Sequence, residues 1–128
     1  MSRYVIDASA WIEYLRGSQL GEQVKGYIES KESEAFTPLL TIAEVVSVVR
    51  REGKDHEIAY RHMLSLSKFL AMDPELCVEA GLFHATMRAT IKDFGLADAF
   101  VFAAAKKIKA KIITKDRHFK GFKEAILI

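Results

Sequence analysis

The feature that most constrains the fold is an alternation of short β-prone runs with longer segments of helical periodicity along the 128 residues. The β-prone runs are Arg3–Ile6, Ala35–Thr37, Phe69–Met72, Lys111–Thr114 and Ala125–Ile128. Strands connected through helices form right-handed crossovers, which place the strands parallel. The sequence therefore predicts an α/β fold, a three-layer α/β/α sandwich whose mostly parallel sheet is covered on both faces.

The first helical segments begin and end at recognisable residues. Ser9 is placed to cap a helix that carries Trp11 in the core and ends at Gly17. Two further segments, Ser18–Ser30 and Asp55–Ser67, mix apolar and charged residues at helical spacing. Each could line a groove for a partner protein, face solvent or form a dimer contact.

The remaining helices carry similar signals. The run Thr41–Glu44 matches a capping box that opens a helix ending at about Arg51. Asp73–Pro74 supplies a cap and a first-turn proline for a long helix, which we expect to stop near Gly95. The segment Leu96–Ile108 is apolar on nearly all sides, as expected of a helix buried deep in a domain.

Length and composition predict one ordinary globular domain covering residues 1–128. Apolar residues make up 50% and charged residues 28% of the chain, which excludes disordered and low-complexity classes. Cys77 has no cysteine or histidine at metal-ligand spacing, so we expect it to pack in the core. Asp7 comes too early for a signal-peptide core, and no apolar run approaches the roughly 20 residues of a membrane span. We expect a cytoplasmic protein without a membrane segment.

Four acidic residues follow the predicted strands or open the helices after them. Asp7 and Asp116 lie at strand ends, and Glu44 and Asp98 lie in first helical turns. In a parallel sheet these positions share one edge, where α/β folds bind ligands. Taken singly, each acid is explained as a cap, a helix-dipole partner or a turn former. Those explanations do not predict that all four converge.

A carboxylate cluster needs protonation or a cation. Two carboxylates about 4 Å apart repel by about 4 kcal/mol at an effective dielectric of 20. Oxygen ligands suit Mg²⁺ or Mn²⁺. Of the four histidines, we expect His56, His62 and His84 to be surface or packing residues, and His118 stays open because it follows Asp116 by two residues. The hydroxyls of Ser9 and Thr114 could support such a site.

Basic residues gather near the C-terminus. Eight of the nineteen lysines and arginines follow position 105, against only Asp116 and Glu124. The skew favours an anionic partner, although a solvated lysine-rich surface explains it equally well.

Three motifs resemble the PIN-domain family, most closely the VapC-type ribonuclease toxins of toxin–antitoxin pairs. The first is Tyr4–Ile12 and the second is Thr41–Val45. The third and most specific is Gly95–Phe100, continuing through Ala103–Lys109 into Ile113–Phe119. Together they span essentially the whole chain in the family's order.

The resemblance implies a five-stranded parallel sheet and Mg²⁺- or Mn²⁺-dependent endonucleolytic cleavage of RNA that leaves 3′-hydroxyl ends. It also implies homodimerisation and inhibition by a small, VapB-like antitoxin. It carries over the acids Asp7, Glu44, Asp98 and Asp116 as the catalytic and metal-binding set, with Ser9 and Thr114 as supporting hydroxyls.

Beside these four acids, we expect three basic side chains to hold RNA phosphates: Lys115, Arg117 and Lys120. One departure from the family concerns position 118, where many relatives carry an acid and this chain has His118. Asp93 could substitute as an outer acid, or be an exposed turn residue.

Two other functions fit the same residues. In the first, Asp7 is a covalent phosphoacceptor, but such phosphatases want a second carboxylate two residues later, where this chain has Ser9. In the second, a catalytically silent PIN domain binds RNA; the presence of all four acids argues against it.

Overall fold

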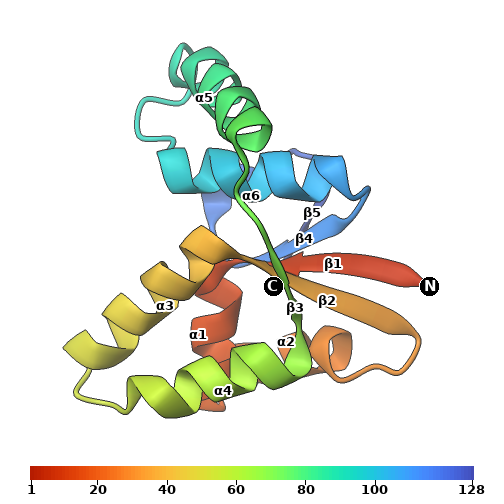
Figure 1. Cartoon of the computed structure of the whole chain (residues 1–128), viewed down its shortest axis with the longest axis vertical. Helices are drawn as coiled ribbons and strands as arrows, with labels where there is room; N and C mark the ends of the chain where they lie inside the picture. The colour runs from red at the N-terminus through yellow and green to blue at the C-terminus, as the bar shows by residue number, and fades with distance from the viewer.

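The computed structural model describes residues 1–128 and has one five-stranded sheet (Figure 1). All four strand pairings are parallel, in the order β3-β2-β1-β4-β5. The strands are β1 (Ser2–Ile6), β2 (Ser33–Pro38), β3 (Lys68–Leu70), β4 (Lys111–Thr114) and β5 (Ala125–Leu127). This confirms the predicted parallel sheet and its five strands.

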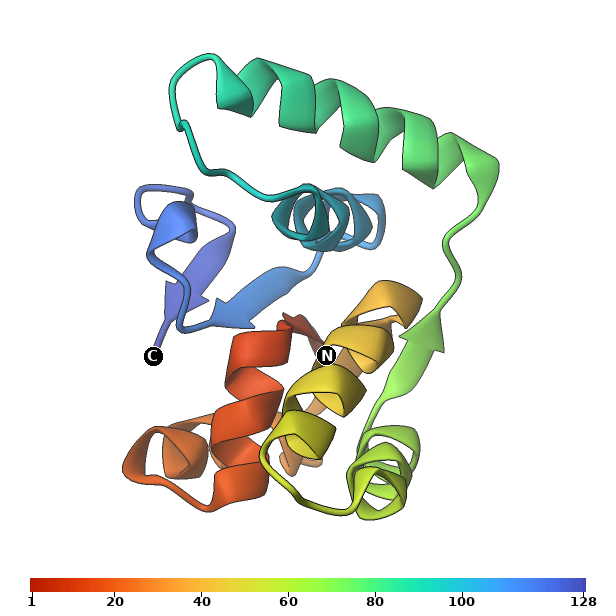
Figure 2. The same ribbon diagram turned by 90° about the vertical axis from the view of Figure 1, so that its left-hand side faces the viewer.

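The chain has six α-helices, which lie on both sides of the sheet and confirm the three-layer arrangement (Figures 1 and 2). One face carries the first four helices and the other carries α6, with α5 outside it. A short 3₁₀ helix, η1, follows β4. The helices are α1 (Ala8–Arg16), α2 (Gln19–Ile28), α3 (Leu39–Arg51), α4 (His56–Leu66), α5 (Pro74–Arg88), α6 (Leu96–Lys107) and η1 (Arg117–Phe119).

The two central strands send alternate side chains into two different cores. Val5 pairs in register with Ile112, and both pack toward α6. Ile6 pairs with Ile113, and both pack with fully buried Trp11 toward the first four helices. The period-2 alternation thus buries both faces of β1 and β4, so these strands are the fixed centre of the fold.

Two predictions about α5 are wrong. The helix ends at Arg88 rather than near Gly95, because the following residues form a turn that inserts fully buried Phe94 beside α5 and α6. Cys77 is exposed rather than packed in the core. As the outermost helix, α5 buries only a narrow stripe that includes Leu76 and Ala80, and Cys77 points away from it.

Two predicted helix caps are also wrong. Helix α1 begins at Ala8 with Asp7 as its N-cap residue, so Ser9 lies inside the first turn. Helix α3 begins at Leu39 directly after β2, so Thr41 and Glu44 lie within the helix and form no capping box. The chain turns into each helix as soon as its strand ends, which frees these side chains for other contacts.

None of the helices combines the length and the apolar character that a membrane span requires.

Candidate metal centre at the carboxyl edge of the sheet

Asp7 is held between the two central strands and the start of α1. Its backbone N–H donates to the carbonyl oxygen of Ile113 (3.0 Å), and its own carbonyl oxygen accepts from the N–H groups of Ala10 and Trp11. The residue is only 6% exposed. The β1–α1 junction thus fixes a carboxylate at the carboxyl edge of the sheet.

Two hydroxyls converge on the same oxygen of Asp7. Ser9 Oγ and Thr114 Oγ1 donate to Asp7 Oδ2, at 3.0 and 2.7 Å. Each hydroxyl in turn accepts a backbone N–H from the loop after β4, Ser9 from Lys115 (2.9 Å) and Thr114 from Asp116 (3.0 Å). Because a hydroxyl has one proton, this pattern commits both protons to Asp7. The hydroxyls therefore join the Asp7 carboxylate to the loop that carries Asp116.

Asp98, Asp116 and His118 form the tightest group of the site. One potential ligand atom from each of the three lies within 4.8 Å of the others. Asp98, in the first turn of α6, accepts the N–H of Gly95 at Oδ2 (3.2 Å). Asp116 precedes η1 and accepts the N–H of His118 at Oδ1 (2.9 Å). Both carboxylates are thereby oriented by backbone N–H groups.

Glu44 approaches the site from α3 with an unsatisfied oxygen. Its Oε1 atom is buried and has no hydrogen-bond partner, and the same holds for Oγ1 of fully buried Thr41. A buried acceptor without a partner destabilises the folded state, because the oxygen has lost its hydrogen bonds to water and forms none within the protein. A cation at this place would satisfy the Glu44 carboxylate.

The electrostatics show that the four acids act on one another. Burial raises the pKa of Asp7 to about 6, with a further contribution from the charge of Asp98. Burial, followed by the charges of Asp7, Asp98 and Asp116, raises the pKa of Glu44 to about 7. The pKa of Asp98 is also raised, first by burial and then by Asp116. No lysine or arginine forms an ion pair with any of them.

The only basic side chain in contact with these acids is the imidazole of His118. Its Nδ1 atom lies 3.2 Å from Asp98 Oδ2 and 3.4 Å from Asp116 Oδ1, and its Nε2 atom lies 3.3 Å from Asp93 Oδ1. Burial lowers the pKa of His118, but the hydrogen bond to Asp98 and the neighbouring charges outweigh burial and raise it above the ordinary value. Even when it is protonated, one imidazole ring carries a single positive charge and cannot neutralise four carboxylates.

The donor set therefore fits a hard divalent cation. Several carboxylates meet at one edge, their pKa values are raised, and Glu44 offers a buried oxygen without a partner. Mg²⁺ and Mn²⁺ prefer oxygen ligands of this kind. Asp98 and Asp116 are positioned to be direct ligands, and Asp7 and Glu44 lie outside that tight group while sharing its electrostatic field.

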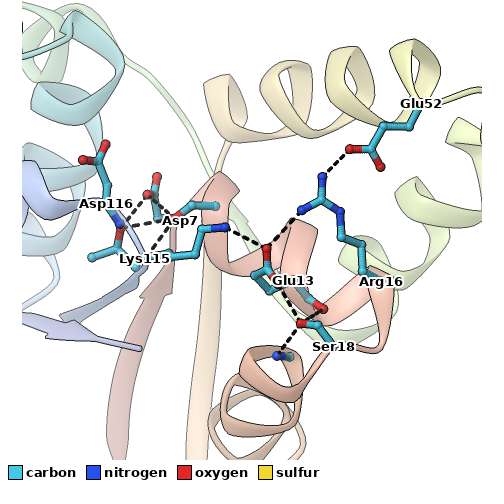
Figure 3. A network of polar contacts seen from close by, with 10 residues as sticks. Asp7, Glu13, Arg16, Ser18, Glu52, Lys115 and Asp116 are labelled. Atoms are coloured by element: carbon cyan, nitrogen blue, oxygen red, sulfur yellow. Dashed lines mark hydrogen bonds and ion pairs between the residues drawn. The ribbon is translucent and has the colours of Figure 1, made fainter.

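A second polar network, which the sequence reasoning missed, extends from this site along α1 (Figure 3). Buried Glu13 accepts from Lys115 Nζ (2.9 Å) and Arg16 Nη1 (3.0 Å) at Oε2, and from Ser18 Oγ (2.7 Å) at Oε1. Arg16 also pairs with Glu52. Ser9 and Glu13 are four residues apart on one helix face, a spacing that could have placed Glu13 near the β4 loop in advance.

The three predicted RNA-contacting residues differ in their surroundings. All three are exposed. Lys115 is held by Glu13, whereas Arg117 and Lys120 have no ion pair within the chain. Arg117 and Lys120 are therefore the freer cations beside the acidic edge. Of the other histidines, His56 and His62 are exposed and His84 contacts the carbonyl oxygen of Phe94, which confirms the prediction for all three.

Comparison with known proteins assigns the family. The model of the PIN-domain family matches residues 4–125, nearly the whole chain. The chain belongs to the PIN-domain family. The predicted acids of this PIN domain all fall within the matched region, as does His118. No curated protein sequence matches the chain at a significant level.

Solved structures with the same fold include toxins and toxin–antitoxin complexes. A Klebsiella pneumoniae toxin–antitoxin complex aligns with a TM-score of 0.73 at 19% identity, covering 96% of this chain and 95% of that one. VapC20 of Mycobacterium tuberculosis, a toxin that cleaves the sarcin–ricin loop, aligns with a TM-score of 0.71 at 18% identity, covering 93% and 91%. A Pyrobaculum aerophilum protein aligns with a TM-score of 0.68 at 26% identity, covering 98% and 90%. The likeness extends over whole chains, so the PIN domain here keeps the family architecture.

Proposed function

We propose that this PIN domain is a metal-dependent endoribonuclease and the toxin of a toxin–antitoxin pair. The observation that carries the proposal is the convergence of four acids at one sheet edge with no lysine or arginine to balance them. A structural role would favour neutralising partners, as Glu13 has. An uncompensated acidic edge is suited to binding a cation and, through it, a phosphodiester.

The proposed roles follow from the positions of the side chains. Asp98 and Asp116 would hold Mg²⁺ or Mn²⁺ directly, with Asp7 and Glu44 completing the site. When bound, the cation activates water and stabilises the leaving oxygen of the phosphodiester. In the metal-free protein burial raises the pKa of Asp7 to about 6, and a bound cation would favour its ionised form as a ligand. Ser9 and Thr114 keep Oδ2 of Asp7 engaged, and this orients the other oxygen.

The test is RNA cleavage by the purified protein. Defined single-stranded RNAs are incubated with chelator, Mg²⁺, Mn²⁺ or Ca²⁺, and the products are mapped. We expect cleavage with Mg²⁺ or Mn²⁺, none in chelator and poor turnover with Ca²⁺, whose longer and more flexible coordination positions water poorly. Asp7→Asn, Glu44→Gln, Asp98→Asn and Asp116→Asn should each remove most cleavage. Full activity in chelator or in Asp98→Asn would exclude this mechanism.

We further propose that a small antitoxin protein inhibits the enzyme by placing an arginine among the four carboxylates. A guanidinium offers five donors in a planar fork and can satisfy acids that otherwise need a metal. A groove of about 240 Å³ between α1, α3 and α4, lined by residues such as Ile12, Val49 and Ile58, has room for one or two apolar side chains of such a partner. The structural likeness to the Klebsiella pneumoniae toxin–antitoxin complex supports this partner class.

The partner proposal has its own test. The product of an adjacent short gene is copurified with this chain, and each arginine in its C-terminal half is changed to alanine. We expect inhibition to compete with Mn²⁺ and to be lost in one variant. We propose that the enzyme acts on RNA in the cytoplasm.

We also propose that the enzyme is a homodimer. Val78 and Leu82 lie one turn apart on α5 and are 62% and 66% exposed, an apolar pair that a second copy could cover. Val78→Glu combined with Leu82→Glu should then give a monomer in sedimentation analysis.

The two alternatives are less well supported. As a phosphoacceptor, Asp7 would need an accessible carboxylate and a nearby general acid, but it is 6% exposed and its neighbour at two residues is Ser9. A silent RNA-binding domain would have no use for an acidic edge that repels phosphate. Binding of RNA without cleavage under any metal would favour the silent domain.

A further inference from the structure

The ring of His118 has one nitrogen inside the acidic edge and one outside it. Nδ1 faces inward, toward Asp98 Oδ2 (3.2 Å) and Asp116 Oδ1 (3.4 Å). Nε2 faces outward, toward Asp93 Oδ1 (3.3 Å). Asp93 lies in the turn between α5 and α6 and its side chain is 84% exposed, so it belongs to no part of the acidic edge itself.

This arrangement is the one that metal-binding histidines usually show. A histidine that coordinates a metal through one nitrogen almost always gives the N–H of the other to a carboxylate or carbonyl, which fixes the tautomer and the ring orientation. Asp93 is such a carboxylate. When a cation displaces the proton shared by Nδ1 and Asp98, the remaining ring proton sits on Nε2, 3.3 Å from Asp93 Oδ1, and Nδ1 offers its lone pair on the side of Asp98 and Asp116.

The spacing also fits a shared cation. Two adjacent ligands of an octahedral ion, each about 2.1 Å from it, lie about 3 Å apart. The inward contacts of Nδ1, at 3.2 and 3.4 Å, are close to that separation. The backbone adds a constraint, because the N–H of His118 donates to Asp116 Oδ1 and ties the histidine to its neighbouring ligand.

We propose that His118 is a direct ligand of the cation through Nδ1, with Asp93 as its orienting partner, so that the site prefers a transition-metal ion such as Mn²⁺ over Mg²⁺. The inference rests on the proposed function, since it presumes a cation at the acidic edge. An imidazole ligand favours the first-row transition metals, whereas a ligand set of oxygens alone suits Mg²⁺. One nitrogen among the carboxylates thus shifts the selectivity of the site.

The decisive measurement is pulsed electron paramagnetic resonance of the protein loaded with Mn²⁺. A directly bound imidazole nitrogen gives a ¹⁴N coupling to the manganese. We expect this coupling in the wild type and its loss in His118→Ala and His118→Asp. His56→Gln, which changes an exposed histidine far along the chain at the start of α4, is the matched control and should keep the coupling.

Binding titrations test the selectivity and the role of Asp93. His118→Asp should lower the preference for Mn²⁺ over Mg²⁺ by about tenfold, because it restores an all-oxygen site. Asp93→Asn should weaken Mn²⁺ binding by about tenfold while keeping the nitrogen coupling, as expected for loss of an orienting partner.

The outcomes separate the inference from the proposed function. Mn²⁺ that binds the wild type without nitrogen coupling, and is lost in Asp98→Asn, would overturn the ligand role of His118 and leave the carboxylate site standing. Failure of the wild type to bind Mn²⁺, or equally tight binding by Asp98→Asn, would overturn both. Coupling that survives in His118→Ala would also overturn the inference.

Discussion

Thr114 donates a hydrogen bond of 2.7 Å from Oγ1 to Oδ2 of Asp7, although 107 residues separate the two in the chain. The bond joins the ends of β1 and β4, which are neighbours in the sheet. Both residues are buried, so the bond forms where water does not compete. The position of the Asp7 carboxylate therefore depends on the pairing of the central strands as well as on local sequence.

Replacing Thr114 by valine should disturb Asp7 without changing the shape of the core. The hydrogen bond from Thr114 is one of the interactions that lower the pKa of Asp7, so its loss should raise that pKa further above 6. Losing a bond to a buried carboxylate costs about 1.5–3 kcal/mol. Thermal unfolding at neutral pH checks the stability, and NMR titration of the carboxyl carbons checks the pKa. Thr90→Val, at an exposed turn, should change neither.

The metal-free protein should lose stability as the pH rises from about 4 to about 7. The pKa of Asp7 rises from 3.8 to about 6 on folding, so the folded state binds the proton more tightly than the unfolded state does. That stabilisation is complete below the unfolded pKa and is lost as the pH rises through 6. Glu44, with a pKa of about 7, extends the decline.

Asp7→Asn should remove much of this pH dependence. The rise in the pKa of Asp7 on folding corresponds to about 3 kcal/mol of free energy of unfolding. The variant should therefore be more stable than the wild type by up to that amount at pH 7.5, and the two should have nearly equal stability at pH 4. Chemical denaturation in chelator across this pH range is the measurement. Glu32→Gln, an exposed loop substitution, is the control. A wild-type stability that is flat between pH 4 and 7 would contradict the raised pKa values.

Arg117 and Lys120 should contribute more to RNA binding than Lys115 does. Lys115 is paired with buried Glu13, and moving it to a phosphate would leave that glutamate with less compensation. For single strands, each lost phosphate contact reduces the slope of log affinity against log salt by about 0.7. Arg117→Ala and Lys120→Ala should each show this change in a catalytically inactive background.

Lys115→Ala should instead mainly lower the unfolding temperature. An unchanged salt slope in the combined Arg117→Ala and Lys120→Ala variant would assign these cations to ordinary solvated surface.

Two glycines of α2 should respond in opposite ways to alanine. A Cβ atom at Gly21 would lie 2.2 Å from the carbonyl oxygen of Glu13, because α1 and α2 pack closely there. Gly21→Ala should therefore destabilise the protein by about 1–3 kcal/mol. A Cβ atom at Gly26 meets nothing within 4 Å, so Gly26→Ala should be neutral or stabilising by up to about 1 kcal/mol. Unfolding midpoints in denaturant compare the two variants directly.

The sequence by itself determined the layers and the edge at which the candidate metal centre lies. The alternation of strands and helices specified the parallel sheet, and the cap at Asp73 formed as local signals predicted. The four acids could be placed at one edge because every parallel strand exits there, whatever the strand order. The sequence left open whether His118 contributes to the site, because no residue near it in the chain specifies the direction of its ring.

Only the tertiary structure decided the contacts between distant segments. Ser9 matched an N-cap, yet its hydroxyl bonds Asp7 and the β4 loop because the central strands bring that loop within reach. Buried Glu13 is paired with Lys115, 102 residues away, and exposed Cys77 lies on the outer face of a helix whose other side is covered. Local sequence patterns reflect the stability of a single turn or cap. The contacts of Ser9, Glu13 and Cys77 depend instead on which distant segments strand pairing and helix packing bring next to them.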